Sequence, residues 1–324
     1  MSRRSPVELG LSFSGWAESC LRLPAHESVQ RPVSPQDSGC NGSKAMIVDC
    51  HTHIWRAEHW SAEGAGDSAR ARAGPIDLEV TREAHWQAME VVDRAIVFGL
   101  RAQHVGIVVP NDFVADYVKR HPDKLIGFTS IDPNESDYMD ELHRSVEDLG
   151  LRGVKLGPIY QNYHPMDERA RPVYEYCQTR MLPIIIHQGA TFPRRAPLKF
   201  ASPVQLEDVA LAYPDLKMVI AHLGHPWIEE AIVLIRKQPN LYADISALHY
   251  RPWQFYNGLV CAKEYGVLDK LLFGSDFPFT TPVATIEALR DFNSMVAGTN
   301  LPLLTEEEIE GLIQSPTLTF LDLS

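Results

Sequence analysis

The chain alternates two kinds of segment, and this alternation most limits the folds open to it. Eight short runs are apolar and rich in β-branched residues, which is typical of buried strands. They lie at 46–50, 94–98, 125–129, 152–156, 183–187, 217–222, 240–244 and 271–276. The longer segments between them have the apolar spacing of amphipathic helices. Repeated strand–helix units predict a (β/α)8 barrel, whose usual length is about 250 residues, and a doubly wound open sheet is the alternative.

Local signals place the limits of several helices. The apolar residues of 136–149 fall on one face of a helix that follows a serine, and Gly150 is placed to end it. Ser202 precedes a proline and has a glutamine three residues on, which predicts an N-cap. Thr305 and Glu308 repeat this capping-box pattern near the C-terminus. Further helices are predicted at 81–92, 111–120, 168–180, 227–237, 254–266 and 283–296.

Residues 1–45 differ from the rest of the chain. They are rich in Ser, Pro, Arg and Gly and show no sustained periodicity, whereas Met46 opens the first predicted strand. We therefore predict that 1–45 is a flexible N-terminal extension and that 46–324 forms the barrel domain.

The composition limits the partners of the protein. Of its 324 residues, 45% are hydrophobic and 22% are charged, and the formal net charge is −12. A negative chain without a densely basic segment argues against a nucleic-acid or membrane partner and favours a small-molecule substrate. No apolar run reaches the roughly 18 to 20 residues of a membrane helix. The five cysteines are scattered with no CxxC pair, which fits the reducing cytoplasm. A homo-oligomer is compatible with this composition.

The first predicted strand ends in two histidines. His51 and His53 lie one residue apart in the stretch IVDCHTHIW. Successive side chains of a strand alternate faces, so both rings are expected to point the same way, while Cys50 packs on the other face. For the pair alone, polar side chains that reach water at a strand end are an equally good interpretation.

Other strand ends carry similar residues. Lys155 lies at the end of the fourth run, His187 of the fifth, His222 of the sixth and Asp276 of the eighth. In a barrel, the C-terminal ends of the strands meet at one mouth, where catalytic groups collect. This set of residue types at matching positions predicts a metal site, of which the histidine pair of the first strand is half.

This ordered set of motifs resembles the amidohydrolase superfamily of metal-dependent hydrolases. The HxH motif, the single histidines after the fifth and sixth strands and the GSDFP aspartate carry the resemblance. More narrowly, the chain resembles the amidohydrolase-related branch of this superfamily. That branch includes amino-carboxymuconate-semialdehyde decarboxylase, resorcylate-type decarboxylases and pyrone-dicarboxylate lactonase. The resemblance implies that His51, His53, His187 and Asp276 bind one divalent metal ion, usually zinc. It also implies that His222 acts as an acid or base without binding the ion.

Elementary chemistry agrees with these roles. Three neutral imidazoles and a carboxylate suit Zn²⁺ and leave room for water or substrate. Such an ion lowers the pKa of its water toward 7 and polarises a substrate oxygen. His222 can then move a proton at neutral pH, and Asp276 can accept the proton of the attacking water. The expected substrate is a small ester, lactone or amide that is carboxylated or aromatic.

Lys155 has three interpretations. In two-metal amidohydrolases, a lysine at this strand end is carboxylated and bridges the ions, and the histidines of the fifth and sixth strands hold the second ion. The other interpretations are an ion pair with an acidic residue and the binding of a substrate carboxylate. We predict one metal ion and an unmodified Lys155 that contacts the substrate.

Loops after the strands are expected to add substrate contacts. Arg194 and Arg195 follow the fifth strand and can bind a carboxylate through parallel hydrogen bonds, or they can be plain exposed residues. Trp55 follows the first strand and is expected to line a pocket for an aromatic or planar substrate.

Three classes of function are compatible with the sequence. The favoured class is a metal-dependent hydrolase, partly because some decarboxylases of this branch have an acidic residue where this chain has His51. The second is a non-oxidative decarboxylase with the same ligands, in which a proton replaces CO₂ at carbon. The third is a barrel with a structural metal and no activity, and it is disfavoured because structural zinc sites are closed rather than placed at a barrel mouth.

Overall fold

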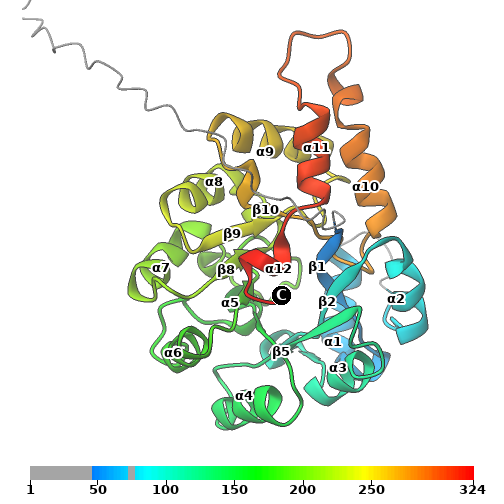
Figure 1. Ribbon diagram of the computed structural model, residues 1–324. Coiled ribbons are helices and arrows are strands. Elements are labelled where there is room, and N and C mark those ends of the chain that lie inside the picture. The colour runs from blue at the N-terminus through cyan, green and yellow to red at the C-terminus, as the bar shows by residue number, and fades with distance from the viewer. Residues whose placement is uncertain (1–45, 72–76) are drawn as a thin grey trace, which may run out of the picture. The chain divides into compact units, whose positions relative to one another are not determined.

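The computed structural model describes residues 46–71 and 77–324, so the predicted flexible extension 1–45 lies outside the described residues. Eight parallel strands form one sheet in the order β1-β2-β5-β6-β7-β8-β9-β10 (Figure 1). Backbone hydrogen bonds from Cys50 N to Phe273 O and from Asp276 N to His51 O join the first strand to the last. The sheet therefore closes into the predicted (β/α)8 barrel, and the doubly wound open sheet is excluded.

Every predicted strand of the barrel is present. The barrel strands are β1 (Val48–His53), β2 (Arg94–Phe98), β5 (Leu125–Ser130), β6 (Val154–Leu156), β7 (Ile184–Ile186), β8 (Met218–Ile220), β9 (Leu241–Asp244) and β10 (Leu271–Leu272). A short antiparallel hairpin, β3 (Arg101–Ala102) and β4 (Ile107–Val108), follows β2. Helices cover the outside of the barrel and side chains fill its inside, which explains why the strands are continuous apolar runs.

The helices surround the strands (Figure 1). They are α1 (Ala62–Ala71), α2 (Arg82–Ala88), α3 (Asn111–Val118), α4 (Tyr138–Glu147), α5 (Pro158–Gln161), α6 (Arg171–Arg180), α7 (Glu207–Ala212), α8 (Ile228–Lys237), α9 (Pro252–Glu264), α10 (Pro282–Arg290), α11 (Glu306–Ile313) and α12 (Thr317–Phe320). None of the described helices is long and apolar enough to cross a membrane.

Two predicted caps have different outcomes. The Thr305 side chain accepts from Glu308 N, and the Glu308 side chain accepts from Thr305 N, so the capping box at the start of α11 is confirmed. The predicted cap at Ser202 is wrong, because its hydroxyl donates to Glu230 Oε2 of α8 at 2.6 Å. The segment after Ser202 begins as a short 3₁₀ helix, Pro203–Leu206, without a side-chain cap.

The end of β1 departs from a regular strand. Its pairing with β2 shifts register between Asp49 and Thr52. Cys50, which strict alternation predicts on the outer face, instead packs inside the barrel against residues such as Phe98 and Leu272. The packing role predicted for Cys50 is retained, but the face predicted for it is wrong because the register shift interrupts the alternation.

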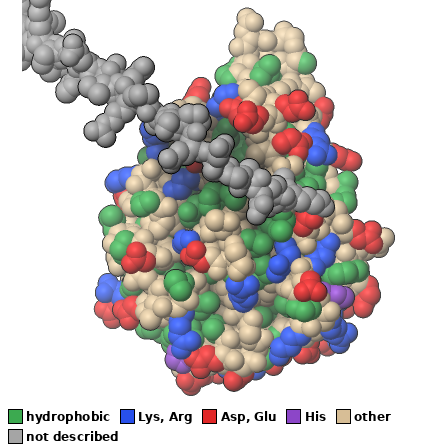
Figure 2. Space-filling view, in the orientation of Figure 1, with side chains coloured by type: hydrophobic (Ala, Val, Ile, Leu, Met, Phe, Trp, Pro, Cys, Tyr) green, Lys and Arg blue, Asp and Glu red, His purple; other side chains and the backbone are tan. Residues whose placement is uncertain are grey.

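The base of the barrel is filled from inside. An inner apolar cluster combines strand residues with Leu321 and Leu323, which follow α12 and are both buried. Arg152 donates to Leu323 O at 3.2 Å and Lys217 pairs with Asp322 at 2.6 Å, which fixes this segment across the base. Figure 1 shows α12 and the C-terminus in the middle of the ring of helices. Because this segment closes the base, access to the interior is through the opposite mouth. On the base, acidic and basic side chains are intermingled (Figure 2).

Candidate active site

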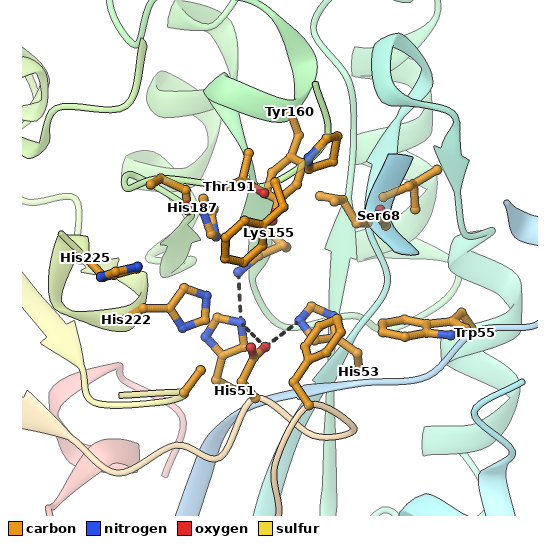
Figure 3. Close-up of a pocket in the computed structure, with 18 of the residues that line it drawn as sticks. His51, His53, Trp55, Ser68, Lys155, Tyr160, His187, Thr191, His222 and His225 are labelled. Carbon is orange, nitrogen blue, oxygen red and sulfur yellow. Dashed lines mark hydrogen bonds and ion pairs between the residues drawn. The ribbon is translucent and has the colours of Figure 1, made fainter. Parts of the chain in front are cut away.

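A pocket lies at the C-terminal ends of the strands, where the residues predicted from the sequence meet (Figure 3). Its empty space, including the open mouth, is about 880 Å³, which suits a small molecule. The four predicted metal ligands line it together with His222 and Lys155. Aromatic side chains form much of the remaining wall, namely Trp55, Trp60, Tyr160, Phe192, Tyr250 and Phe279.

His51 lies at the centre of the polar contacts. Its Nδ1 donates to Asp244 Oδ2 at 2.8 Å, and its Nε2 accepts from Lys155 Nζ at 3.2 Å. The same Nε2 lies 3.5 Å from Asp276 Oδ1, and His53 Nε2 lies 3.3 Å from that oxygen. Dashed lines from the His51 and His53 rings in Figure 3 mark these contacts. The predicted convergence of the two histidines on one point is therefore confirmed.

Asp276 reaches the pocket through a strained turn after β10. Its φ of 65° lies in the left-handed region. This backbone conformation costs a non-glycine residue about 1 to 3 kcal/mol, and residues that adopt it cluster at functional sites. Asp276 N donates to His51 O and Phe279 N donates to Asp276 O, both at 2.8 Å, and these bonds hold the turn. A Cβ at Gly274 would lie 3.1 Å from His51 Cβ and 3.2 Å from Ser246 Cβ, so glycine allows the close approach.

His222, the second residue after β8, also has left-handed backbone, with a φ of 54°. Its Nδ1 lies 2.8 Å from Ser246 Oγ and 3.2 Å from Ser246 O. Ligand atoms of His51, His222 and Asp276 all lie within 4.8 Å of one another, close enough to hold one ion. Geometry thus allows His222 to bind metal, in addition to the acid or base role that the resemblance implies.

His187 and Lys155 complete the polar floor. His187 Nε2 donates to Ala190 O at 3.2 Å, which leaves Nδ1 with the lone pair, and its ring centre is 5.0 Å from that of His222. Lys155 comes from β6, and its side chain is buried with Nζ 4.6 Å from the centre of the Phe98 ring. Burial lowers the pKa of Lys155 to about 8, although the nearby aspartates favour its charged form.

Burial keeps the imidazoles of the pocket neutral. Desolvation, and next the Lys155 charge, lower the pKa of His53 and of His187 to about 3. Desolvation also lowers the pKa of His51 and of His222 well below the usual range, with further contributions from neighbouring histidines. Neutral imidazole is the form that binds a metal ion or accepts a proton. The imidazoles of the site therefore present lone pairs rather than charges at neutral pH.

The residues predicted to bind substrate are only partly brought together. Trp55 lines the pocket as predicted, and its Nε1 donates to Asp77 O at 3.0 Å. Arg194 and Arg195 are exposed and lie outside the set of described lining residues, and Arg195 pairs with Glu63 at 3.2 Å. Arg251, which precedes α9, is instead the arginine among the described residues that line the pocket.

Sequence reasoning missed three residues that shape this site. Asp244 ends β9 and contacts His51, and Ser246 contacts His222. Asp244 follows an apolar run, as Lys155 does, so the same signal was available for it. Arg251 lies in a loop segment and carries no comparable local signal.

Comparison with known proteins agrees with this geometry. A family model described as Amidohydrolase matches residues 48–313, so the chain belongs to the amidohydrolase family. No curated protein sequence gives a significant match.

Solved structures share the fold. An uncharacterised TIM-barrel protein from Bordetella bronchiseptica has 22% identity and a TM-score of 0.63, covering 86% of this chain and 99% of that one. A probable 2-pyrone-4,6-dicarboxylic acid hydrolase from Acinetobacter baumannii, with citric acid bound, has 20% identity and a TM-score of 0.59, with coverage of 85% and 98%. A dihydroxybenzoic acid decarboxylase from Polaromonas sp. JS666, with bound manganese and an inhibitor, has 17% identity and a TM-score of 0.58, with coverage of 86% and 97%. At these identities the likeness establishes the shared fold.

Proposed function

We propose that the protein is a metal-dependent hydrolase that cleaves a small carboxylated or aromatic ester, lactone or amide by attack of water. The observation that carries this proposal is the convergence of four neutral imidazoles, one carboxylate and a buried lysine on one pocket with aromatic walls. Family membership supports an enzyme of the amidohydrolase type.

The donor atoms fit a divalent ion of intermediate softness, of which zinc is our choice. By the resemblance, His51, His53, His187 and Asp276 would hold it. Ligand atoms of His51, His222 and Asp276 lie within 4.8 Å of one another, and His53 Nε2 lies 3.3 Å from Asp276 Oδ1, so His222 is near enough to take part. When bound, the ion acidifies water and polarises a substrate oxygen. The manganese in the related decarboxylase supports a divalent metal here.

The protein's own residues divide the remaining work. His222 holds its Nδ1 proton toward Ser246, so its Nε2 lone pair is available to accept a proton from the attacking water. The same imidazole then returns this proton to the leaving group. Lys155 Nζ, next to His51 Nε2, donates to negative charge that develops on the substrate oxygen.

The walls of the pocket favour a planar acid. Trp55 and Tyr160 offer ring faces to an aromatic or unsaturated substrate. Arg251 is half-buried, and its Nη1 donates to Ala247 O at 2.6 Å, which fixes the guanidinium in the pocket wall. Its other N–H groups can bind a carboxylate of the substrate.

Metal content tests the first part of the proposal. Protein purified without chelators is expected to carry about one zinc ion per chain, and His51→Ala, His187→Ala and Asp276→Ala are each expected to lose it. His164→Ala, at an exposed position, is the control and is expected to keep it. Two ions per chain, with the mass of CO₂ added at Lys155, would instead establish the binuclear site.

Isotope labelling tests the reaction. Once a panel of small esters, lactones and aromatic acids gives a substrate, turnover in ¹⁸O-water is expected to place ¹⁸O in the new carboxylate. His222→Asn is expected to remove most of the turnover, since an amide forms hydrogen bonds but does not act as an acid or base near neutral pH.

Non-oxidative decarboxylation is the second candidate. The likeness over 86% of this chain to a dihydroxybenzoic acid decarboxylase with bound manganese favours it. Release of CO₂, with deuterium from D₂O fixed at the carbon that lost it, would establish decarboxylation and exclude hydrolysis.

A further inference from the structure

Asp244 lies behind the pocket histidines and is fully buried. Its two carboxylate oxygens have separate partners. Oδ2 accepts from His51 Nδ1 at 2.8 Å. Oδ1 accepts from His222 N at 2.9 Å, from Ser246 N at 3.1 Å and from the Ser246 hydroxyl. One carboxylate therefore contacts both histidines, one through its ring and the other through its backbone and a serine.

The partners of His51 determine which ring nitrogen carries the proton. An ionised carboxylate only accepts hydrogen bonds, so Nδ1 must be the protonated nitrogen. On the other side of the ring, Lys155 Nζ donates, so Nε2 must hold the lone pair. Both contacts require the same tautomer, and its lone pair faces Asp276 at 3.5 Å.

The partners of His222 lead to the same result by another route. The carbonyl oxygen of Ser246, 3.2 Å from Nδ1, only accepts. The Ser246 hydroxyl gives its proton to Asp244, so toward His222 it also accepts. Nδ1 of His222 therefore carries the proton, and Nε2 holds the lone pair.

We propose that Asp244 is a positioning residue that holds His51 directly, and His222 through Ser246, in the Nδ1-protonated tautomer, so that His51 presents its Nε2 lone pair to a divalent ion and His222 presents its own to the attacking water. This inference rests on the metal-dependent function proposed above. It adds a pair of residues that act through the histidines rather than on the substrate. A carboxylate behind a histidine ligand has this effect in metal sites generally.

The tautomers of the wild-type protein provide the first test. Full-length protein with ¹⁵N-labelled histidine is stripped of metal by a chelator, and long-range ¹H–¹⁵N spectra report whether each ring nitrogen is protonated. Signals are assigned by loss in His51→Gln and His222→Gln. Both histidines are expected to be protonated at Nδ1, and protonation of either at Nε2 would overturn the proposal. This readout does not depend on any reaction.

Asp244→Asn provides the second test because it preserves shape and reverses one hydrogen bond. The three donors at Oδ1 keep the amide oxygen on their side, so the amide NH₂ faces His51 Nδ1 and donates to it. His51 then has a donor on each side of its ring, so its proton is expected to move to Nε2 as Lys155 Nζ turns away from that nitrogen. The variant is expected to show this shift in its spectrum and to bind Zn²⁺ about 10- to 100-fold more weakly in a competition titration with a chromophoric chelator.

Matched variants separate positioning from stability. Asp208→Asn, at an exposed position on α7, is expected to bind Zn²⁺ as the wild type does. Ser246→Ala removes the hydroxyl link but keeps the carbonyl acceptor, so it is expected to leave the His51 tautomer unchanged. Normal Zn²⁺ affinity in a folded Asp244→Asn protein would overturn the proposal. Confirmed tautomers without hydrolase activity would refute the proposed reaction alone.

Discussion

Acid stability offers a quantitative test of how the barrel uses buried imidazoles. His85 lies on α2, fully buried against β1. Its Nε2 donates to Thr52 Oγ1 at 2.9 Å, because the Thr52 hydroxyl itself donates to Ile96 O. Its Nδ1 therefore accepts from Tyr117 OH at 3.0 Å. The neutral ring is fully satisfied, whereas a second ring proton would require the Tyr117 hydroxyl to turn its own proton away and accept instead.

The perturbation is His85→Gln, which keeps one donor and one acceptor but does not titrate. Desolvation lowers the pKa of His85 from 6.5 to about 3 in the folded protein. Below pH 6.5 the unfolded chain therefore binds a proton that the folded chain does not, so stability falls as the pH falls. From pH 7 to pH 5 this single group is expected to remove about 2 kcal/mol from the free energy of unfolding.

The assay is urea unfolding of the full chain between pH 7 and pH 5 at constant ionic strength. As the pH falls from 7 to 5, the free energy of unfolding of His85→Gln minus that of wild type is expected to rise by about 2 kcal/mol. This change is expected whatever the difference between the two proteins is at pH 7. The other buried histidines contribute to both proteins and largely cancel. His164→Gln, at an exposed position, is the control. Parallel curves for His85→Gln and wild type would refute the assignment of a neutral, satisfied ring.

Three further substitutions test other parts of the structure. Leu321→Ala, in the inner cluster, is expected to lower the free energy of unfolding by about 2 to 5 kcal/mol. A loss below about 1 kcal/mol in urea titrations would contradict a tightly packed base. Arg251→Met is expected to raise KM about 10- to 100-fold for a carboxylated substrate and not for its methyl ester, so equal effects on both would exclude a carboxylate contact. Thr305→Ala removes one half of the capping box and is expected to cost about 1 kcal/mol, measured as a lower Tm, whereas an unchanged Tm would show that the cap does not stabilise α11.

The barrel could be predicted because its signal is local. Strands that are buried on both faces must be short continuous apolar runs, and each run was recognisable by itself. The convergence of His51 with Asp276 could be predicted for a different reason. Barrel topology brings the C-terminal ends of all strands to one mouth, so the position of a residue in its strand is enough to place it there.

What could not be predicted depends on contacts between distant segments. The register shift that turns Cys50 inward arises where β1 pairs with β2. Arg195 does not line the pocket and pairs with Glu63 of α1 instead, a contact that no local pattern indicates. Asp244 carried the strand-end signal, but its role follows only from the position of the His51 ring in front of it.

The segment that fills the base also has a consequence for the order in which the protein can fold. Ribosomes make every barrel strand before they make Leu321 and Leu323, and domains in general begin to fold while synthesis continues. Until that segment emerges, the inner cluster lacks two of its buried side chains, and Arg152 and Lys217 lack their partners at the base. A nascent chain with all eight strands would still expose apolar surface at one end of the barrel. Chaperones are therefore expected to bind the nascent chain more strongly before residues 321–323 leave the ribosome than after.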